Sequence, residues 1–172
     1  KLNLSHSIFG LGTKKNSKLK KYFPVDLSKN DSSFKKTVKL LPNCDVLIFL
    51  VGLAHKKGNG KDINEFKKIN KNTLVNLISE LKENNKLPLK IIYGSTVSVY
   101  GEKIDQEIYF EDSIKLPYSS YGITKLAAEE YLFKHFSSQS WILRFSPVYF
   151  ENFMLNINRR SKVKNIYFKV GN

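Results

Sequence analysis

DVLIFLVG (residues 45–52) is an apolar run with the length of one buried strand and a turn. Continuous apolar strands of this kind are typical of parallel sheets that are buried on both faces. Two further apolar runs follow it, at residues 89–93 and 141–145. Stretches with apolar residues at helical spacing lie before and between these runs, at residues 32–41, 62–85 and 119–136. This alternation predicts an α/β fold, a doubly wound parallel sheet with helices on both faces.

Capping residues indicate where two of these helices begin and end. Ser32 or Ser33 is a suitable N-cap for the first helix, and Pro42 ends it. Ser119 or Ser120 is the expected cap of the last helix. Residues 1–24 are basic and show no period, so the pattern assigns no element to them.

Length and charge narrow the class of protein. The chain has 172 residues, enough for one globular domain with a core, and a net charge of +14. Such an excess is typical of nucleic-acid-binding surfaces, but lysine carries nearly all of it and only three residues are arginine. A solvated lysine-rich surface is therefore the favoured interpretation. Its positive field would still attract an anionic substrate such as a sugar nucleotide.

Cysteine and histidine content limits the other possibilities. Cys44 is the single cysteine, which excludes an internal disulfide and any multi-cysteine metal site. His6, His55 and His135 have no ligand spacing, so no metal is predicted. The sequence shows no signal segment and no apolar run of spanning length, and we expect a cytoplasmic protein without a membrane segment.

Tyr121 and Lys125 are the first candidates for chemistry. They lie four residues apart within the predicted helix 119–136, and therefore on one face of it. A phenol has an ordinary pKa near 10, and a neighbouring ammonium group lowers it. The pair is thus a means of making a tyrosine usable as an acid or base, although this spacing alone is common.

Three further features of the sequence support a catalytic role for Tyr121 and Lys125. Ser95 and Thr96 follow the strand at residues 89–93, and ligands of parallel sheets bind at the carboxyl ends of strands. A hydroxyl there can bond a substrate oxygen while Tyr121 exchanges its proton. Gly52 follows the first buried strand, where a small residue lets a planar ligand approach, and Asn70 is polar on a largely apolar helix.

Together these segments resemble the extended short-chain dehydrogenases/reductases, the NAD-dependent epimerase/dehydratase family, in its nucleotide-sugar 4-epimerase-like branch. The resemblance runs from about residue 25 to residue 149. It rests, in order, on PVDLS, CDVLIFLVGLAH, FKKINKNTLVNL, IIYGSTVSVYGE, PYSSYGITKLAAEEYL and ILRFSPVY. It implies a Rossmann-like sheet, a nucleotide-sugar substrate and NAD as cofactor, with NADP left open.

The resemblance also implies roles for particular residues. The cofactor contacts it implies are Asp26 and Leu27 at the adenine, then Leu50, Val51, Gly52, Asn70 and Ser95. Thr96 corresponds to the serine or threonine of the catalytic triad. Tyr121 corresponds to the catalytic tyrosine, and Lys125 to the lysine that also holds the nicotinamide ribose.

The segment after the second strand favours one reaction within the family. Dehydratases of the family resemble Ser-Thr-Asp-Glu-Val-Tyr-Gly, whereas this chain has Val97 and Ser98 in place of the two acids. Neither residue can serve as the acid or base of a dehydration. The expected reaction is therefore oxidation of a sugar hydroxyl by hydride transfer, with Tyr121 as base, Thr96 polarising the sugar oxygen and Lys125 lowering the pKa of Tyr121.

The chain departs from the family at both ends. The family's strand–Gly-x-x-Gly-x-x-Gly–helix unit has no counterpart, and FGLGTKKNS (residues 9–17) is a poor substitute without a preceding buried strand. Phe150 stands where the family has glycine. We therefore expect a partial dinucleotide-binding domain at residues 1–150, the start of a truncated substrate-binding region at 151–172, and weak or absent cofactor binding and turnover by the isolated chain.

Two alternatives to an epimerase stay open at this stage. One is a non-catalytic, degenerate dehydrogenase scaffold that binds or senses a partner, which the missing glycine-rich loop favours. The other, less favoured, is a basic nucleic-acid-binding domain, suggested by RRSKVKNIYFK (residues 159–169). Because the missing first strand would leave a sheet edge uncovered, we also expect a homodimer or other self-association.

Overall fold

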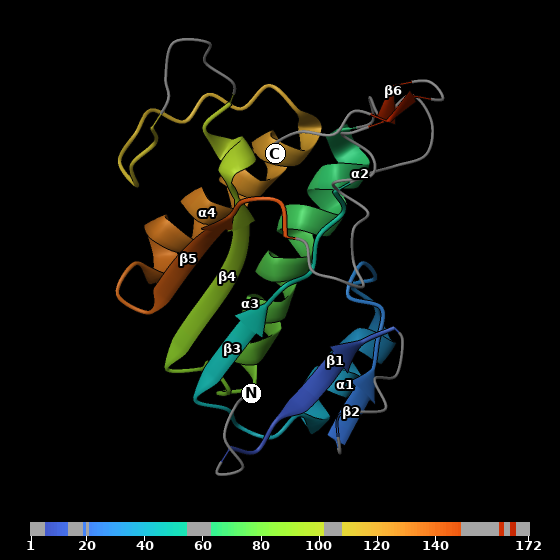
Figure 1. The fold of residues 1–172 in the computed structure, drawn as a ribbon. Coiled ribbons are helices and arrows are strands. Elements are labelled where there is room, and N and C mark those ends of the chain that lie inside the picture. The colour runs from blue at the N-terminus through green and yellow to red at the C-terminus, as the bar shows by residue number, and fades with distance from the viewer. Residues whose placement is uncertain are drawn as a thin grey trace.

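The structure is a computed structural model, and it describes residues 6–13, 19, 21–54, 63–101, 108–148, 162–163 and 166–167. The strands are β1 (Phe9–Gly12), β2 (Lys21–Pro24), β3 (Val46–Phe49), β4 (Lys90–Thr96), β5 (Ser140–Phe145), β6 (Lys162–Val163) and β7 (Ile166–Tyr167). The helices are α1 (Ser32–Leu40), α2 (Ile63–Lys67), α3 (Thr73–Glu83) and α4 (Ser120–Phe136) (Figure 1). A π-helical turn, η1 (Lys68–Asn72), joins α2 to α3, and a 3₁₀ turn, η2 (Val97–Val99), follows β4.

Two parallel sheets form the strand layer. β3, β4 and β5 pair in that order, with Ile48 opposite Ile92 and Ile92 opposite Trp141. β1 and β2 form a separate parallel pair, and β6 and β7 form a short antiparallel one. Parallel strands joined through helices confirm the predicted α/β, Rossmann-like fold.

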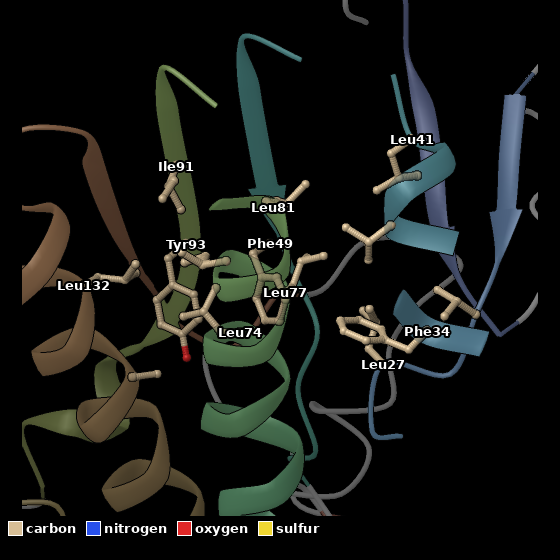
Figure 2. Packing of buried hydrophobic residues seen from close by; sticks show 14 residues of the cluster. Leu27, Phe34, Leu41, Phe49, Leu74, Leu77, Leu81, Ile91, Tyr93 and Leu132 are labelled. Atoms are coloured by element: carbon tan, nitrogen blue, oxygen red, sulfur yellow. The ribbon is translucent and has the colours of Figure 1, made fainter. Parts of the chain in front are cut away.

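One hydrophobic core joins the helices to a single side of this layer. Phe34 of α1, Leu77 of α3 and Leu132 of α4 belong to the same buried cluster as Phe49 of β3 and Tyr93 of β4 (Figure 2). Helices α1, α3 and α4 therefore share one face of the strands, which positions α4 directly against β4.

The opposite face of the three-stranded sheet differs from the expectation. Ile48 is 50% exposed and Trp141 is 60% exposed, and their strand neighbours two residues away are exposed as well. Side chains alternate across a strand, so the residues that point away from α3 and α4 all meet solvent. Within the described ranges, β3 is buried on one face only, and helices on both faces are not seen.

Local capping explains where the helices begin. The carboxylate of Asp31 accepts a hydrogen bond of 2.9 Å from the Phe34 amide, so the N-cap of α1 is Asp31 rather than the predicted Ser32 or Ser33. Ser119 caps α4, as predicted, by accepting a hydrogen bond of 3.0 Å from the Gly122 amide. α1 ends at Leu40, shortly before Pro42.

The glycines near the N-terminus have a role in packing. Gly10 and Gly12 lie inside strand β1, not in a loop that follows a strand. A Cβ on Gly10 would stand 2.5 Å from the Leu19 side chain and 2.8 Å from the Tyr22 ring, so only glycine fits there. Residues 14–17 of FGLGTKKNS lie outside the described residues, so the expectation that this segment is not a phosphate-binding loop stays a prediction.

Some predictions fall outside the described residues. They concern His55, Phe150 and most of residues 151–172. The division of the chain at residue 150 therefore stays a prediction. Among the helices that the structure describes, none has both the length and the apolar character that crossing a membrane requires.

Candidate active site

The candidate site is built where α4 packs against the carboxyl end of β4. Tyr121, Lys125 and Glu129 lie at successive turns of α4 on one face. Facing them are three consecutive residues that end β4, namely Gly94, Ser95 and Thr96. Each of the three helix residues contacts one of these strand residues, so the helix and the strand are held together along their length.

Thr96 and Tyr121 form the outermost pair. Their side chains share a hydrogen bond, and Thr96 Oγ1 also donates to Ser98 Oγ at 3.2 Å. Gly122 permits this approach, because a Cβ there would lie 2.6 Å from the Ser98 carbonyl oxygen. The structure therefore brings together two of the three residues expected to carry catalysis.

Burial changes the pKa of Tyr121 in a way that the sequence did not indicate. Its removal from solvent raises the pKa of the Tyr121 phenol, and the hydrogen bond with Thr96 lowers the pKa only in part. Lys125 is not among the causes that shift this pKa. In this structure the Lys125 ammonium group donates to the Gly94 carbonyl, and the expectation that Lys125 lowers the pKa of Tyr121 stays a prediction.

Lys125 is enclosed by the fold and is only 2% exposed. Its Nζ donates a hydrogen bond to the Gly94 carbonyl and lies 4.2 Å from the centre of the Tyr93 ring. Burial lowers the pKa of Lys125 to about 8, and the negative charge of Glu129 opposes that change. A cation–π contact and a carbonyl thus partly replace the water that the ammonium group has lost.

Asn70 joins three segments beneath the site. It is fully buried in the π-helical turn η1, and its Oδ1 accepts a hydrogen bond of 2.6 Å from the Leu53 amide. Its Nδ2 donates to the Leu53 carbonyl at 3.2 Å and to Thr124 Oγ1 at 3.0 Å. Asn70 therefore fixes the turn after β3 against α4.

Gly52 lies beside both Asn70 and Lys125. A Cβ at Gly52 would stand 3.6 Å from Asn70 Oδ1 and 3.8 Å from Lys125 Nζ. Leu50 lies two residues before Gly52, and its side chain lies close to Gly94 of β4. Leu50 is 70% exposed. The turn at residues 50–52 thus lies close to the end of β4, and its expected contact with a cofactor stays a prediction.

Asp26 and Leu27 occupy a different part of the fold, after β2. Leu27 is buried in the hydrophobic core. Asp26 Oδ1 accepts hydrogen bonds from the Ser28 amide at 3.0 Å and the Ser28 hydroxyl at 2.7 Å. These bonds lower the pKa of Asp26, and the charges of Lys29 and Lys68 add to the effect. The structure does not bring these two residues into contact with Thr96 or Tyr121.

Two site residues were not identified from the sequence. Glu129 is buried and lies one helical turn after Lys125. Arg144 of β5 forms an ion pair with Glu129, with 2.8 Å between Nη2 and Oε2. The signal was present, because Glu129 continues the four-residue spacing of Tyr121 and Lys125. Arg144 similarly interrupts the apolar run of β5 with a charge. Among the residues with described positions, no group of histidine, cysteine and acidic side chains could hold a metal ion.

Comparisons with solved structures agree with this arrangement. UDP-glucuronic acid 4-epimerase from Bacillus cereus, in complex with NAD, is 27% identical with a TM-score of 0.61, over 83% of this chain and 49% of that one. UDP-N-acetylglucosamine 4-epimerase from Bacillus cereus is 25% identical with a TM-score of 0.64, over 89% and 52%. The RMD protein of Pseudomonas aeruginosa, complexed with NADPH, is 21% identical with a TM-score of 0.61, over 79% and 52%, and shows the fold alone.

The chain matches only part of each of these solved structures. It spans about half the length of the solved structures that it resembles. None of the curated proteins matches it. The family model for the NAD dependent epimerase/dehydratase family matches residues 2–166, nearly the whole sequence. The chain therefore belongs to the NAD dependent epimerase/dehydratase family.

Proposed function

We propose that this chain is the dinucleotide-binding part of a nucleotide-sugar epimerase that oxidises a sugar hydroxyl by hydride transfer to a nicotinamide cofactor. The observation that carries the proposal is the Thr96–Tyr121 hydrogen bond with Lys125 one helical turn further along α4. Membership of the family and the 27% identity to a 4-epimerase complexed with NAD support it.

The proposed chemistry uses these three side chains in distinct ways. In its phenolate form, which the positive charge of Lys125 would favour, Tyr121 removes the proton of the sugar hydroxyl, and it returns that proton when the carbonyl is reduced again. Thr96 bonds the same sugar oxygen and holds it within reach of the phenol. Lys125 supplies a fixed positive charge close to the proton transfer, where low polarity makes charge effective. A bound nicotinamide supplies the hydride acceptor and donor.

The residues around the candidate site fit the nicotinamide end of such a cofactor. The turn at Leu50, Val51 and Gly52 and the Lys125 ammonium would hold its nicotinamide side, because Gly52 leaves the backbone open beside Lys125. Asp26 and Leu27 would contact the adenine. NAD is the proposed cofactor, with NADP left open. Since the two glycines of β1 lie within a strand, we expect the isolated chain to bind it weakly and to show no turnover.

A dehydration is disfavoured by the residues after Thr96. Val97 is an exposed apolar residue, and Ser98 is engaged with Thr96 through both its amide and its hydroxyl. Neither can transfer protons to carbon or to a leaving hydroxyl. An epimerisation, or a one-way oxidation of the same hydroxyl, needs no further acid or base than Tyr121.

A titration followed by nuclear magnetic resonance tests the proposal on the chain as it stands. NAD and then UDP-glucose are added up to millimolar concentration, and backbone shifts are recorded. We expect changes at residues 50–53, 94–96 and 121–125, and we expect the change at residues 94–96 to shrink in Tyr121→Phe. Tyr118→Phe, an exposed tyrosine just before α4, is the matched control.

The same titration separates the competing functions. Shifts confined to other surfaces would contradict the proposed site. A non-catalytic scaffold on this fold is favoured by the two strand-bound glycines of β1, and it predicts binding of a partner without any response to a sugar nucleotide. The nucleic-acid alternative stays a prediction, because the side chains of residues 159–169 lie outside the described set.

A further inference from the structure

Glu129 is a buried carboxylate that the proposed chemistry does not use. It is 3% exposed and lies one turn after Lys125 on α4. It accepts a hydrogen bond from the Ser95 hydroxyl on one side. A buried ionised carboxylate is costly unless its oxygens are well paired, so its partners indicate what it does.

Arg144 provides the rest of that pairing. Its Nη2 lies 2.8 Å from Oε2 of Glu129, and its Nε lies 3.2 Å from both carboxylate oxygens. Arg144 is itself fixed, because Nη1 donates to the Tyr100 hydroxyl at 2.6 Å and to the Glu111 carbonyl at 2.8 Å. The guanidinium also lies 4.9 Å from the centre of the Tyr100 ring. These contacts hold the carboxylate in one orientation.

The network reaches the candidate site through the strand. Ser95, which Glu129 holds, lies between Gly94 and Thr96. Lys125 binds the Gly94 carbonyl, and Tyr121 binds the Thr96 side chain. A change at Glu129 therefore acts on both neighbours of Ser95 through one residue of backbone.

We propose that Glu129 is a positioning residue of this site, one that keeps Lys125 in its ammonium form and holds Ser95 so that Gly94 and Thr96 meet their helix partners. The catalytic meaning of this role rests on the proposed function. The role itself concerns the charge of Lys125, which exists without any ligand.

The charges around Lys125 determine the direction of the effect. The titratable groups beside it in the described residues are Tyr93 from β4 and Tyr121 and Glu129 from α4, with Arg144 of β5 behind Glu129. From η1, the uncharged Asn70 side chain bonds Thr124, the residue before Lys125 on α4. Burial raises the pKa of the Tyr93 phenol and of the Tyr121 phenol, so burial does not favour a negative charge on either. Glu129 is therefore the anion that stabilises the Lys125 ammonium.

The test is the titration of Lys125 in the 172-residue chain, labelled with carbon-13 at lysine Cε. Lys125→Arg identifies the signal by removing it. In Glu129→Gln we expect the midpoint to fall from about 8 to about 7 or lower. Glu130→Gln changes the exposed acid next in sequence, and we expect it to leave the midpoint in place. An unchanged midpoint in Glu129→Gln would overturn the proposal.

A second variant covers the case in which Glu129→Gln does not fold. Glu129→Gln combined with Arg144→Met removes both members of the ion pair, which is commonly tolerated better than removal of one. We expect a smaller fall in the Lys125 midpoint than in Glu129→Gln, because the positive charge of Arg144 is lost as well; such a fall supports the proposal, and a midpoint that stays at about 8 contradicts it. Since no cofactor or sugar takes part, this outcome is independent of the ligand titration that tests the proposed function.

Discussion

At the scale of single residues, Lys125 connects the site to the stability of the fold. Its pKa is lowered to about 8, whereas the unfolded chain has an ordinary lysine. Between these two values the unfolded state binds more protons than the folded state, so stability increases as the pH rises through that range. The gain is the relief of a buried ammonium group, and it is complete only near the ordinary pKa of lysine.

This linkage gives a prediction for Lys125→Met. Relative to this variant, we expect the unmodified chain to gain about 2 kcal/mol in free energy of unfolding between about pH 8 and about pH 10. Urea unfolding at several pH values measures the difference. Lys134→Met, at an exposed lysine of the same helix, is expected to leave the pH dependence unaltered. A parallel pH dependence in the chain and in Lys125→Met would show that Lys125 titrates normally.

The residues of the site were predictable to different degrees. Thr96, Tyr121 and Lys125 follow from spacing and from the strand predicted at residues 89–93, although β4 continues to Thr96. The structure places Thr96 against Tyr121. The environment of Lys125 was not predictable, because Tyr93 and Glu129 reach it only after α4 has packed on β4. Periodicity states which face a residue occupies, but not which charges meet it there.

At the scale of elements, the turn η1 shows how a single side chain determines local geometry. The sequence predicts one helix at 62–85, and the structure has two α-helices, α2 and α3, with the π turn η1 between them. π turns inside α-helices often accompany functional sites. Here the turn carries Asn70, whose partners Leu53 and Thr124 are 17 and 54 residues away in sequence. Helical periodicity holds no information about such distant partners.

Asn70→Ala tests how much this turn contributes. The substitution leaves the Leu53 amide and carbonyl without their side-chain partner in a largely buried place, which costs on the order of 2 kcal/mol in free energy of unfolding. Chemical denaturation measures the loss. Asn72→Ala, at an exposed position in the same turn, is the matched control, and we expect little change. Equal effects of the two substitutions would argue against the bridging role of Asn70.

At the scale of the whole molecule, the sequence predicts which layers form better than it predicts which sheet faces are covered. Parallel pairing and the order of helices and strands follow from apolar runs. Two features do not follow. β1 is four residues long with two glycines, too short and too flexible a pattern to be read as a strand. β3 is uniformly apolar, yet only one of its faces is covered. The composition of a strand shows which of its faces could be buried, but it does not show which other elements pack against them.

That uncovered face leads to a prediction of self-association. Apolar side chains project from it at Val46, Ile48, Trp141, Leu143 and Phe145. Contiguous apolar surface of this kind favours contact with another surface. We expect the chain to associate in sedimentation velocity runs, and the double substitution of Ile48 and Trp141 by lysine to shift it toward monomer. Phe133→Lys adds the same charge at an apolar position of α4 that is 74% exposed, and it should leave association intact. If the unmodified chain is monomeric, this face is not an association surface.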